Sequence, residues 1–430
     1  MSEHPLPVSP VQSFSLANGL RVYLREDRRA PLASVQLWYH VGSSYEPDGH
    51  TGLSHALEHL LFEGSSKLAS GQYSTLMTRL GGDPNAFTYA EATVFPLTLP
   101  VSRLEIALEA MADTMATATL SDAPFARELA VVMAERRATV DNNPLALALE
   151  QHNALAHGSS RYATPVIGHR TDLGYMTSAA ARTWYQTWYH PNNATLSVAG
   201  DIDLQQLHVL VARHFAAIPA HRLPPRQTPV EPPELARRTQ TVRRQGLRPG
   251  VFLSFNLPSQ RTASASTQAH ALRLLPDLLT EGQAAKLQRQ LLIDEQVLQA
   301  LKSTYEPYRR GDSLLTVYAY CSAQVTPEAA ADRLMAQIEA FRQTLPSNDD
   351  LQRAKARLLA RQLFARDDIA EQADAIGRQA VCGLDPIALA EDREAIEAVN
   401  AEHVRQAAHD YLTASRVAIT FMHNQESADE

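Results

Sequence analysis

The chain has 430 residues, of which 45% are hydrophobic and 20% are charged, and its formal net charge is −8. This length exceeds what one ordinary hydrophobic core organises, so we expect at least two domains. The acidic charge argues against nucleic acid as a partner, and a total of two cysteines excludes a disulfide framework and a cysteine-rich metal site.

The N-terminal segment 1–20 has neither the basic start nor the long apolar run of a signal peptide. No stretch of the chain reaches the ~18 consecutive apolar residues of a membrane span. We therefore expect a cytoplasmic protein that spans no membrane. A leader removed before residue 1 would instead make it periplasmic or otherwise exported.

The first half of the chain is predicted to form strands interspersed with long helices. Short runs rich in β-branched and aromatic residues predict strands, and longer stretches with Leu and Ala at helical spacing predict helices. The expected strands are Leu20–Leu24, Ser34–His40, Thr93–Leu99 and Ala194–Val198, and the expected helices are Gly52–Phe62, Val101–Ala118 and Pro124–Val140.

The helix at Gly52–Phe62 carries two histidines and a glutamate in the order H-x-x-E-H. His55 and His59 are four residues apart, so they lie one turn apart on one face and can reach one Zn²⁺ at about 2.0–2.1 Å. Glu58 flanks that face and can reach a metal-bound water without being a ligand. The alternative is three polar residues on the solvated side of a helix, because the motif fixes only three positions.

A third ligand is required because a catalytic zinc has three protein ligands and an open position. The helix at Pro124–Val140 offers Glu128 and Glu135, which are seven residues apart and therefore share one face. A carboxylate from this face would complete a set of two histidines and one glutamate. Glutamates at this spacing are also common on solvated helices, so the pair is informative only beside the first motif.

Residues 221–234 contain five prolines and no apolar periodicity, which predicts an extended linker between domains at 1–220 and 235–430. The second half then repeats the order of strands and helices of the first. We therefore expect an α+β fold of two homologous α/β-sandwich-like domains that arose by internal duplication. The expected strands are Gly250–Leu257, Leu314–Tyr320 and Arg416–Met422, and the expected helices are Ser264–Leu279, Pro327–Thr344 and Asn348–Phe364.

The two cysteines, Cys321 and Cys382, lie in the second half of the chain. We expect two buried thiols, with one structural disulfide between them as the alternative.

Together these segments resemble the insulinase–pitrilysin family of inverted-motif zinc peptidases, and in particular its short two-domain members related to mitochondrial processing peptidase. Glu135 follows His59 by 76 positions and Glu128 by seven, and both spacings match the family pattern. The resemblance is strong in the first half and weak in the second. It also covers 41–66, Gly81–Phe95 and Trp188–Asp203.

The resemblance implies roles for individual residues. His55, His59 and Glu135 are similar to the family's ligands of one Zn²⁺ per chain. Glu58 is similar to the general base that activates the attacking water. Glu128 resembles an acidic residue that lies behind the ligands and orients the site.

The resemblance also implies a substrate and an architecture. Asn85 and Ala86 occupy the positions at which family members present backbone to an extended peptide, a form of strand addition. The implied activity is that of a zinc endopeptidase or oligopeptidase acting on unfolded peptides. The two domains would form half of a clamshell chamber.

One departure from the family pattern lies in the second half. Complete family enzymes carry an arginine and, seven residues later, a tyrosine, which bind substrate and help to stabilise the oxyanion. These positions align with Leu292 and Gln299, and neither side chain can replace its counterpart. We therefore expect the metal-bearing subunit of a heterodimer, whose partner lacks the zinc motif and supplies the Arg/Tyr pair, with a homodimer as the alternative. If the alignment is shifted or the pair is replaced from elsewhere, the candidates are Arg309, Arg310, Tyr318 and Tyr320.

A non-catalytic assembly subunit of the same fold is the competing interpretation. Inert relatives typically lose the motif residues. His55, Glu58, His59 and Glu135 are all present here, which favours an enzyme.

Overall fold

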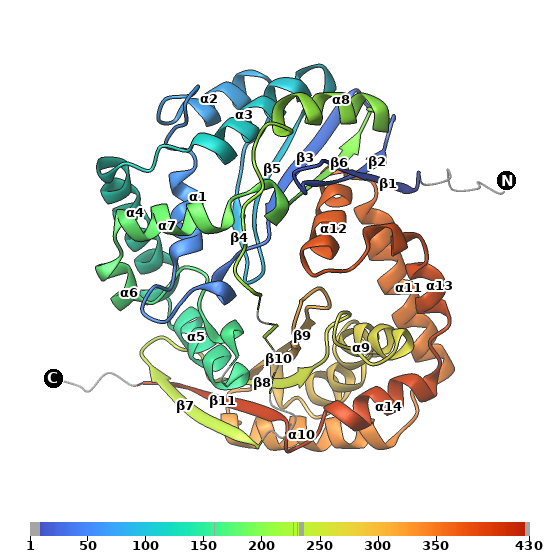
Figure 1. Ribbon diagram of the computed structural model, residues 1–430. Helices are drawn as coiled ribbons and strands as arrows, with labels where there is room; N and C mark the ends of the chain where they lie inside the picture. The colour runs from blue at the N-terminus through green and yellow to red at the C-terminus, as the bar shows by residue number, and fades with distance from the viewer. Residues whose placement is uncertain (1–8, 159, 227, 230, 232–235, 426–430) are drawn as a thin grey trace. The chain divides into compact units, whose positions relative to one another are not determined.

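The computed structural model describes residues 9–158, 160–226, 228–229, 231 and 236–425 (Figure 1). None of the described helices is long and apolar enough to cross a membrane. The described residues form two compact units, of which unit 1 contains most of the first half of the chain and unit 2 most of the second. The helices that begin in unit 1 are α1 (Leu53–Leu60), α2 (Gln72–Arg79), α3 (Leu104–Thr117), α4 (Asp122–Arg136), α6 (Arg170–Tyr175), α7 (Ser178–Trp188), α8 (Leu204–Phe215) and α12 (Ile369–Val381). Those of unit 2 and those that begin in it are α5 (Pro144–His157), α9 (Ser266–Leu279), α10 (Pro327–Gln343), α11 (Asn348–Ala365), α13 (Asp392–Glu397) and α14 (Ala401–Tyr411).

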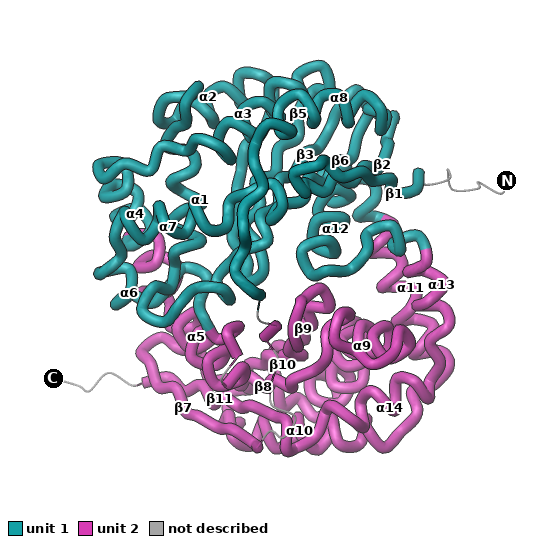
Figure 2. The backbone as a smooth tube through the Cα atoms, in the orientation of Figure 1, with its two compact units in different colours: residues 1–133, 164–227, 364–390 teal, residues 134–163, 228–363, 391–430 magenta. Residues whose placement is uncertain are grey.

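The described strands form two mixed sheets, one in each of two compact units (Figure 2). The sheet of unit 1 has the order β1 (Val11–Ser15), β2 (Arg21–Glu26), β6 (Ala194–Gly200), β3 (Leu32–Tyr39), β5 (Thr93–Pro100) and β4 (Phe87–Thr88). The sheet of unit 2 has the order β7 (Arg238–Arg244), β11 (Val417–Asn424), β8 (Gly250–Leu257), β10 (Ser313–Cys321) and β9 (Leu298–Tyr305).

Apart from β1, which has no counterpart in unit 2, the described strands of the two sheets have corresponding orders and directions. β2 runs parallel to β6, as β7 runs parallel to β11. β3 pairs antiparallel with β6 and β5, as β8 pairs antiparallel with β11 and β10. β4 and β9 are the matching antiparallel edge strands. This correspondence confirms the predicted α+β fold of two duplicated halves.

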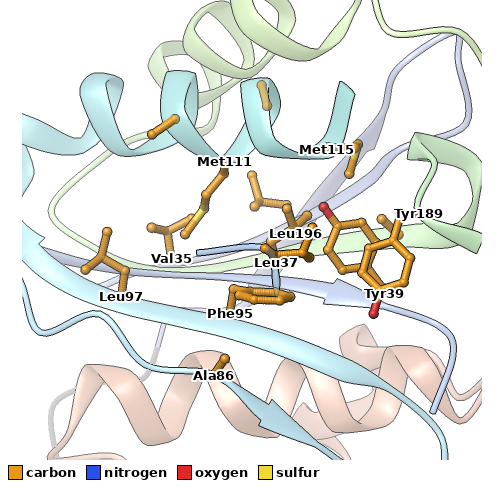
Figure 3. Packing of buried hydrophobic residues seen from close by; sticks show 14 of the residues in the cluster. Val35, Leu37, Tyr39, Ala86, Phe95, Leu97, Met111, Met115, Tyr189 and Leu196 are labelled. Atoms are coloured by element: carbon orange, nitrogen blue, oxygen red, sulfur yellow. The ribbon is translucent and has the colours of Figure 1, made fainter. Parts of the chain in front are cut away.

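Alternation along β3 sets the two faces of the unit 1 sheet. Val35 and Leu37 belong to the main hydrophobic core, and Figure 3 shows them beneath Met111 of α3. Gln36 and Trp38 point to the opposite face and contact α12. Helices therefore cover both faces of the sheet. This explains why seven of the eight residues of β3 are buried.

The units are discontinuous because each half of the chain contributes one helix to the sheet of the other half. Helix α5, from the first half, packs on β7, β8 and β11 of unit 2, and α12, from the second half, packs on β2, β3 and β6 of unit 1. The domains expected at 1–220 and 235–430 therefore differ from the units in two exchanged segments. The expected linker, 221–234, lies partly outside the described residues. Unit 1 consists of 1–133, 164–227 and 364–390, and unit 2 of 134–163, 228–363 and 391–430.

Helix α12 has the sequence of a docked amphipathic helix. Asp368 is its N-cap, and its side chain accepts a hydrogen bond from the backbone N–H of Ala370. Ala373, Ile376 and Ala380 recur at helical spacing and are all buried. The helix was not among those expected from the sequence, and such a stripe does not by itself identify which sheet a helix covers.

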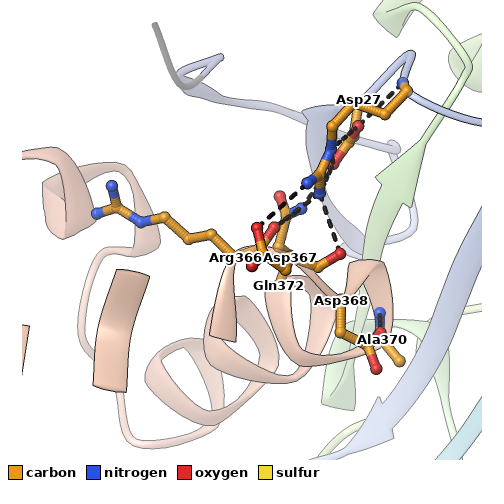
Figure 4. Close-up of polar contacts among 7 residues, drawn as sticks. Asp27, Arg366, Asp367, Asp368, Ala370 and Gln372 are labelled. Carbon is orange, nitrogen blue, oxygen red and sulfur yellow. Dashed lines mark hydrogen bonds and ion pairs between the residues drawn. The ribbon is translucent and has the colours of Figure 1, made fainter. Parts of the chain in front are cut away.

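Polar contacts fix the N-terminal end of α12 against the loop after β2 (Figure 4). Gln372 donates a hydrogen bond of 2.7 Å from Nε2 to Oδ2 of Asp27. Arg29 donates a hydrogen bond of 2.7 Å from Nη2 to the carbonyl oxygen of Arg366. Hydrogen bonds from the Arg29 side chain lower the pKa of Asp27 to about 2. The carboxylate is therefore ionised at neutral pH and anchors both partners.

Most predicted elements agree with the structure to within a few residues. The helix expected at Pro124–Val140 is α4, which ends at Arg136 and continues as one wider π-helical turn over Arg137–Asp141. Both cysteines, Cys321 and Cys382, are buried free thiols, as expected.

Gly377 is required for the close approach of α12 to the unit 1 sheet. A Cβ at this position would lie 2.1 Å from Cε2 of Trp38, which is 1% exposed and donates a hydrogen bond to Ser197. We expect Gly377→Ala to lower the free energy of unfolding by about 1–3 kcal/mol, the usual cost of overpacking. The matched control is Gly174→Ala, because no atom lies within 4 Å of a Cβ there. Equal melting temperatures for the two variants would contradict this packing argument.

Candidate metal centre

The first turn of α1 is fixed by a buried carboxylate. Gly52, just before the helix, has a φ of +90°, in the left-handed region that favours glycine. Glu46 accepts hydrogen bonds of 2.7 Å from the backbone N–H groups of Gly52 and Ser54. Glu46 is 1% exposed, and burial raises its pKa to about 8 although the two donors act in the opposite direction. This cap sets the position of the neighbouring His55.

The two histidines of the motif lie on one face of α1, as their spacing predicts. The ring centroids of His55 and His59 are 4.9 Å apart, with an angle of 76° between the ring planes. Burial, and to a smaller extent the neighbouring His59, lowers the pKa of His55 to about 4. His55 is therefore a neutral imidazole at pH 7, which is the form that binds a metal ion.

Helix α4 brings a carboxylate to the two imidazoles. One ligand atom from each of His55, His59 and Glu135 lies within 4.8 Å of the others. The boundary between the units falls after Met133, within α4, but the helix continues without a break through Glu135. Two imidazole nitrogens and one carboxylate oxygen are the donor set of catalytic zinc sites, so these residues fit that ion.

Glu128 lies beside this cluster, next to one of its histidines. Its Oε2 is 3.6 Å from Nδ1 of His59. Arg127 donates a hydrogen bond to Glu128 and another to Glu63, which also accepts one from Ser70. The pair of glutamates predicted on α4 thus divides into one residue in the cluster and one beside it.

Glu58 points from α1 toward the edge strand β4. It is 8% exposed, and its Oε2 accepts a hydrogen bond of 2.6 Å from Oγ1 of Thr88. Sequence reasoning missed Thr88 and Glu46. Both residues lie in segments that resemble the family, Thr88 in Gly81–Phe95 and Glu46 in 41–66, and this resemblance is the signal that could have found them.

Asn85 and Ala86, the predicted peptide-binding residues, come directly before β4. Asn85 is exposed and its backbone N–H donates to the carbonyl oxygen of Pro96 at 3.4 Å, whereas Ala86 is buried. The ladder itself consists of Phe87 and Thr88. The structure therefore has this segment at the outer edge of the sheet, with one side covered by β5.

In unit 2, the two positions that depart from the family pattern have other partners. Leu292 packs against the hydrophobic core of the unit, and Gln299 is exposed on β9 and accepts a hydrogen bond from Arg248. The guanidinium carbon of Arg248 lies 4.4 Å from the ring centroid of Tyr320. Arg309, a candidate to replace the arginine of the family's Arg/Tyr pair, lies over the ring of Tyr162.

Two family models match consecutive parts of the chain. The model described as insulinase, peptidase family M16, matches residues 21–169, and the model described as the peptidase M16 inactive domain matches residues 175–358.

Two relatives and one solved structure match this chain over most of their own length. The chain is 28% identical to the zinc protease PqqE of Helicobacter pylori over 80% of this chain and 77% of that protein. It is 26% identical to the beta subunit of the mitochondrial-processing peptidase of Bos taurus over 95% of this chain and 83% of that subunit. The fold matches the crystal structure of a protease from Helicobacter pylori with a TM-score of 0.89, at 25% identity, over 96% of this chain and all of that one.

The cap on α1 predicts a measurable contribution of Glu46 to stability. Glu46→Leu leaves two buried N–H donors without their acceptor, and we expect a loss of about 2 kcal/mol or more in the free energy of unfolding. Because the pKa of Glu46 in the folded chain lies above its usual 4.5, the stability it contributes is lost as the pH rises from about 4.5 through about 8. The difference between wild type and variant should therefore be larger at pH 5 than at pH 8.

A control for Glu46→Leu is Asp203→Ala, which removes the carboxylate that caps α8. That change should cost about 1 kcal/mol, as is usual for an N-cap. Chemical denaturation at both pH values measures the two effects. A Glu46→Leu variant as stable as wild type would rule out the capping role.

Proposed function

Because the chain belongs to the insulinase family, peptidase family M16, we propose that it is a zinc-dependent endopeptidase or oligopeptidase that hydrolyses unfolded peptides. The observation that carries the proposal is the convergence of His55, His59 and Glu135, whose ligand atoms lie within 4.8 Å of one another. These three residues would hold one zinc ion. The relatives named as zinc proteases support the same assignment.

The residues around the cluster have distinct roles in the proposed reaction. When bound, zinc supplies Lewis-acid chemistry, because it lowers the pKa of water toward about 7 and polarises the scissile carbonyl. Glu58 accepts a proton from the attacking water and returns it to the departing amine as the C–N bond breaks. Glu128 orients His59 from behind, which is the usual task of a carboxylate next to a ligating histidine.

An extended peptide fits the edge of the unit 1 sheet. β4 is a short terminal strand, and the segment that begins at Asn85 leads directly into it. A peptide that adds to this edge gains backbone hydrogen bonds without a fixed sequence requirement. This mode favours unfolded peptides, because a folded protein has few free strands to offer. Asn85 and Ala86 would contribute to this edge.

We further propose that the chain is the metal-bearing subunit of a heterodimer. Leu292 packs into the core of unit 2 and cannot donate a hydrogen bond to a substrate. Gln299 is engaged by Arg248 and lacks a phenol. A partner subunit with an arginine and a tyrosine at these positions would complete the site. The relative named as the beta subunit of a processing peptidase supports a two-subunit arrangement.

Two substitutions distinguish a loss of catalysis from a loss of zinc binding. Glu58→Gln should retain zinc, because its side chain is not a ligand, and should lower kcat by about 10²–10⁴-fold through loss of general base catalysis. His59→Ala should lose the metal. A quenched fluorescent peptide measures turnover, and elemental analysis measures zinc. Glu109→Gln, which alters an exposed carboxylate paired with Lys67, is the matched control and should behave as wild type.

Two results would contradict this assignment. Near-wild-type hydrolysis by Glu58→Gln would reject its role as the base, and stoichiometric zinc in His59→Ala would reject that ligand. Wild-type protein that binds zinc and cleaves no peptide, alone or with a partner, would instead favour the competing function, a non-catalytic assembly subunit of the same fold.

The heterodimer has its own test. A recombinant relative that lacks the H-x-x-E-H motif and carries the Arg/Tyr pair should form a complex with this chain and raise kcat sharply. Sedimentation measures the complex, and the peptide assay measures its activity. Full peptidase activity of the isolated, monodisperse monomer would contradict the proposal, and activity that rises with formation of a homodimer would support the alternative assembly.

A further inference from the structure

Thr88 occupies the junction between the edge strand and the helix that carries the motif. It is the last residue of β4 and is paired with Thr93 of β5. The next residue, Tyr89, donates a backbone hydrogen bond of 2.7 Å to the carbonyl oxygen of Ala92. The backbone of Thr88 is therefore held on one side by a regular ladder and on the other by a tight turn.

The side chain of Thr88 forms a short hydrogen bond with Glu58. The distance of 2.6 Å from Oγ1 to Oε2 is in the range of hydroxyl–carboxylate bonds with an ionised acceptor. Glu58 is 8% exposed, and a hydrogen bond is stronger in such a region of low dielectric constant than in water. Threonine is branched at Cβ, so its hydroxyl has few alternative rotamers. The donor is therefore rigid.

The carboxylate of Glu58 requires such a donor to have a defined orientation. The final torsion of a glutamate side chain is broad, because it joins a tetrahedral and a planar carbon. Even where the first two side-chain torsions place the carboxyl group, this last torsion leaves the direction of its plane open. A bond to one oxygen, Oε2, defines that plane and with it the direction of the other oxygen.

We propose that Thr88 is a positioning residue that orients Glu58 for proton transfer. This inference rests on the proposed function, in which Glu58 is the base. Thr88 also belongs to the strand on which a peptide would pair, so one short segment orders both the substrate and the base. A misplacement of about 1 Å in such a constellation can cost 10²-fold in rate.

The test compares Thr88→Val, which keeps the shape and removes the hydroxyl, with Thr88→Ser, which keeps the hydroxyl. For Thr88→Val we expect kcat to fall by about 10–10²-fold, with KM, zinc content and melting temperature unchanged. Thr88→Ser should recover most of the rate. Thr98→Val makes the same change at a half-buried position of β5 and should leave kcat unchanged. In a Glu58→Gln background, Thr88→Val should cause no further loss, because the two residues act as a unit.

A wild-type kcat in Thr88→Val would overturn the inference while leaving the proposed function intact. A loss in Thr88→Val that Thr88→Ser shares, or that accompanies lost zinc or a lower melting temperature, would show a structural role and also overturn it. If Thr88→Val fails to fold, Thr88→Ala with the same measurements decides. A wild-type protein that lacks peptidase activity both alone and with a partner subunit would overturn the proposed function, and the inference with it.

Discussion

Two imidazoles on one helix and a carboxylate on another can reach a common point only if the two helices are held in a fixed relation. Packing supplies most of this constraint for α1. Its leucines are buried in the core of unit 1, and each contributes about 1.5–3 kcal/mol relative to an exposed side chain. The polar residues of the motif are then left to the remaining face. The buried leucines are Leu53, Leu57 and Leu60.

Polar contacts complete what packing leaves undetermined. Glu46 fixes the first turn of α1, and the hydrogen bonds of Arg127 to Glu63 and Glu128 connect the region after α1 to α4. Thr88 reaches the same helix from the sheet edge. Contacts from the loop before α1, from β4 and from α4 therefore hold the candidate metal centre in place, and each contact can be removed by a separate substitution.

Because α5 and α12 are exchanged, neither half of the chain covers both faces of its own sheet. In unit 2, His152 of α5 lies between Thr420 and Ser254, with hydrogen-bond distances of 2.8 and 2.7 Å. Burial lowers the pKa of His152 to about 3, so the ring is neutral and can satisfy both hydroxyls. In unit 1, the contact of Gly377 with Trp38 docks α12 with similar precision. Each unit therefore needs residues from both halves of the sequence.

Local patterns in the sequence were sufficient to predict much of this structure. Alternation identified β10, whose residues are alternately buried and half-buried, and helical spacing identified α1 and the shared face of His55 and His59. The two exchanged helices, α5 and α12, were not among the expected elements, and their apolar stripes would not have identified the sheets that they cover. The contact of Thr88 with Glu58 joins residues 30 positions apart and depends on the register of an edge strand.

The central claim is that His55, His59 and Glu135 hold one zinc ion. Diffraction data collected on either side of the zinc absorption edge, from crystals of the zinc-loaded protein, test it most directly. We predict a single anomalous peak within about 2.0–2.2 Å of one nitrogen from each histidine and one oxygen of Glu135. A peak elsewhere in the chain, or a zinc ion whose ligands do not include Glu135, would contradict the claim.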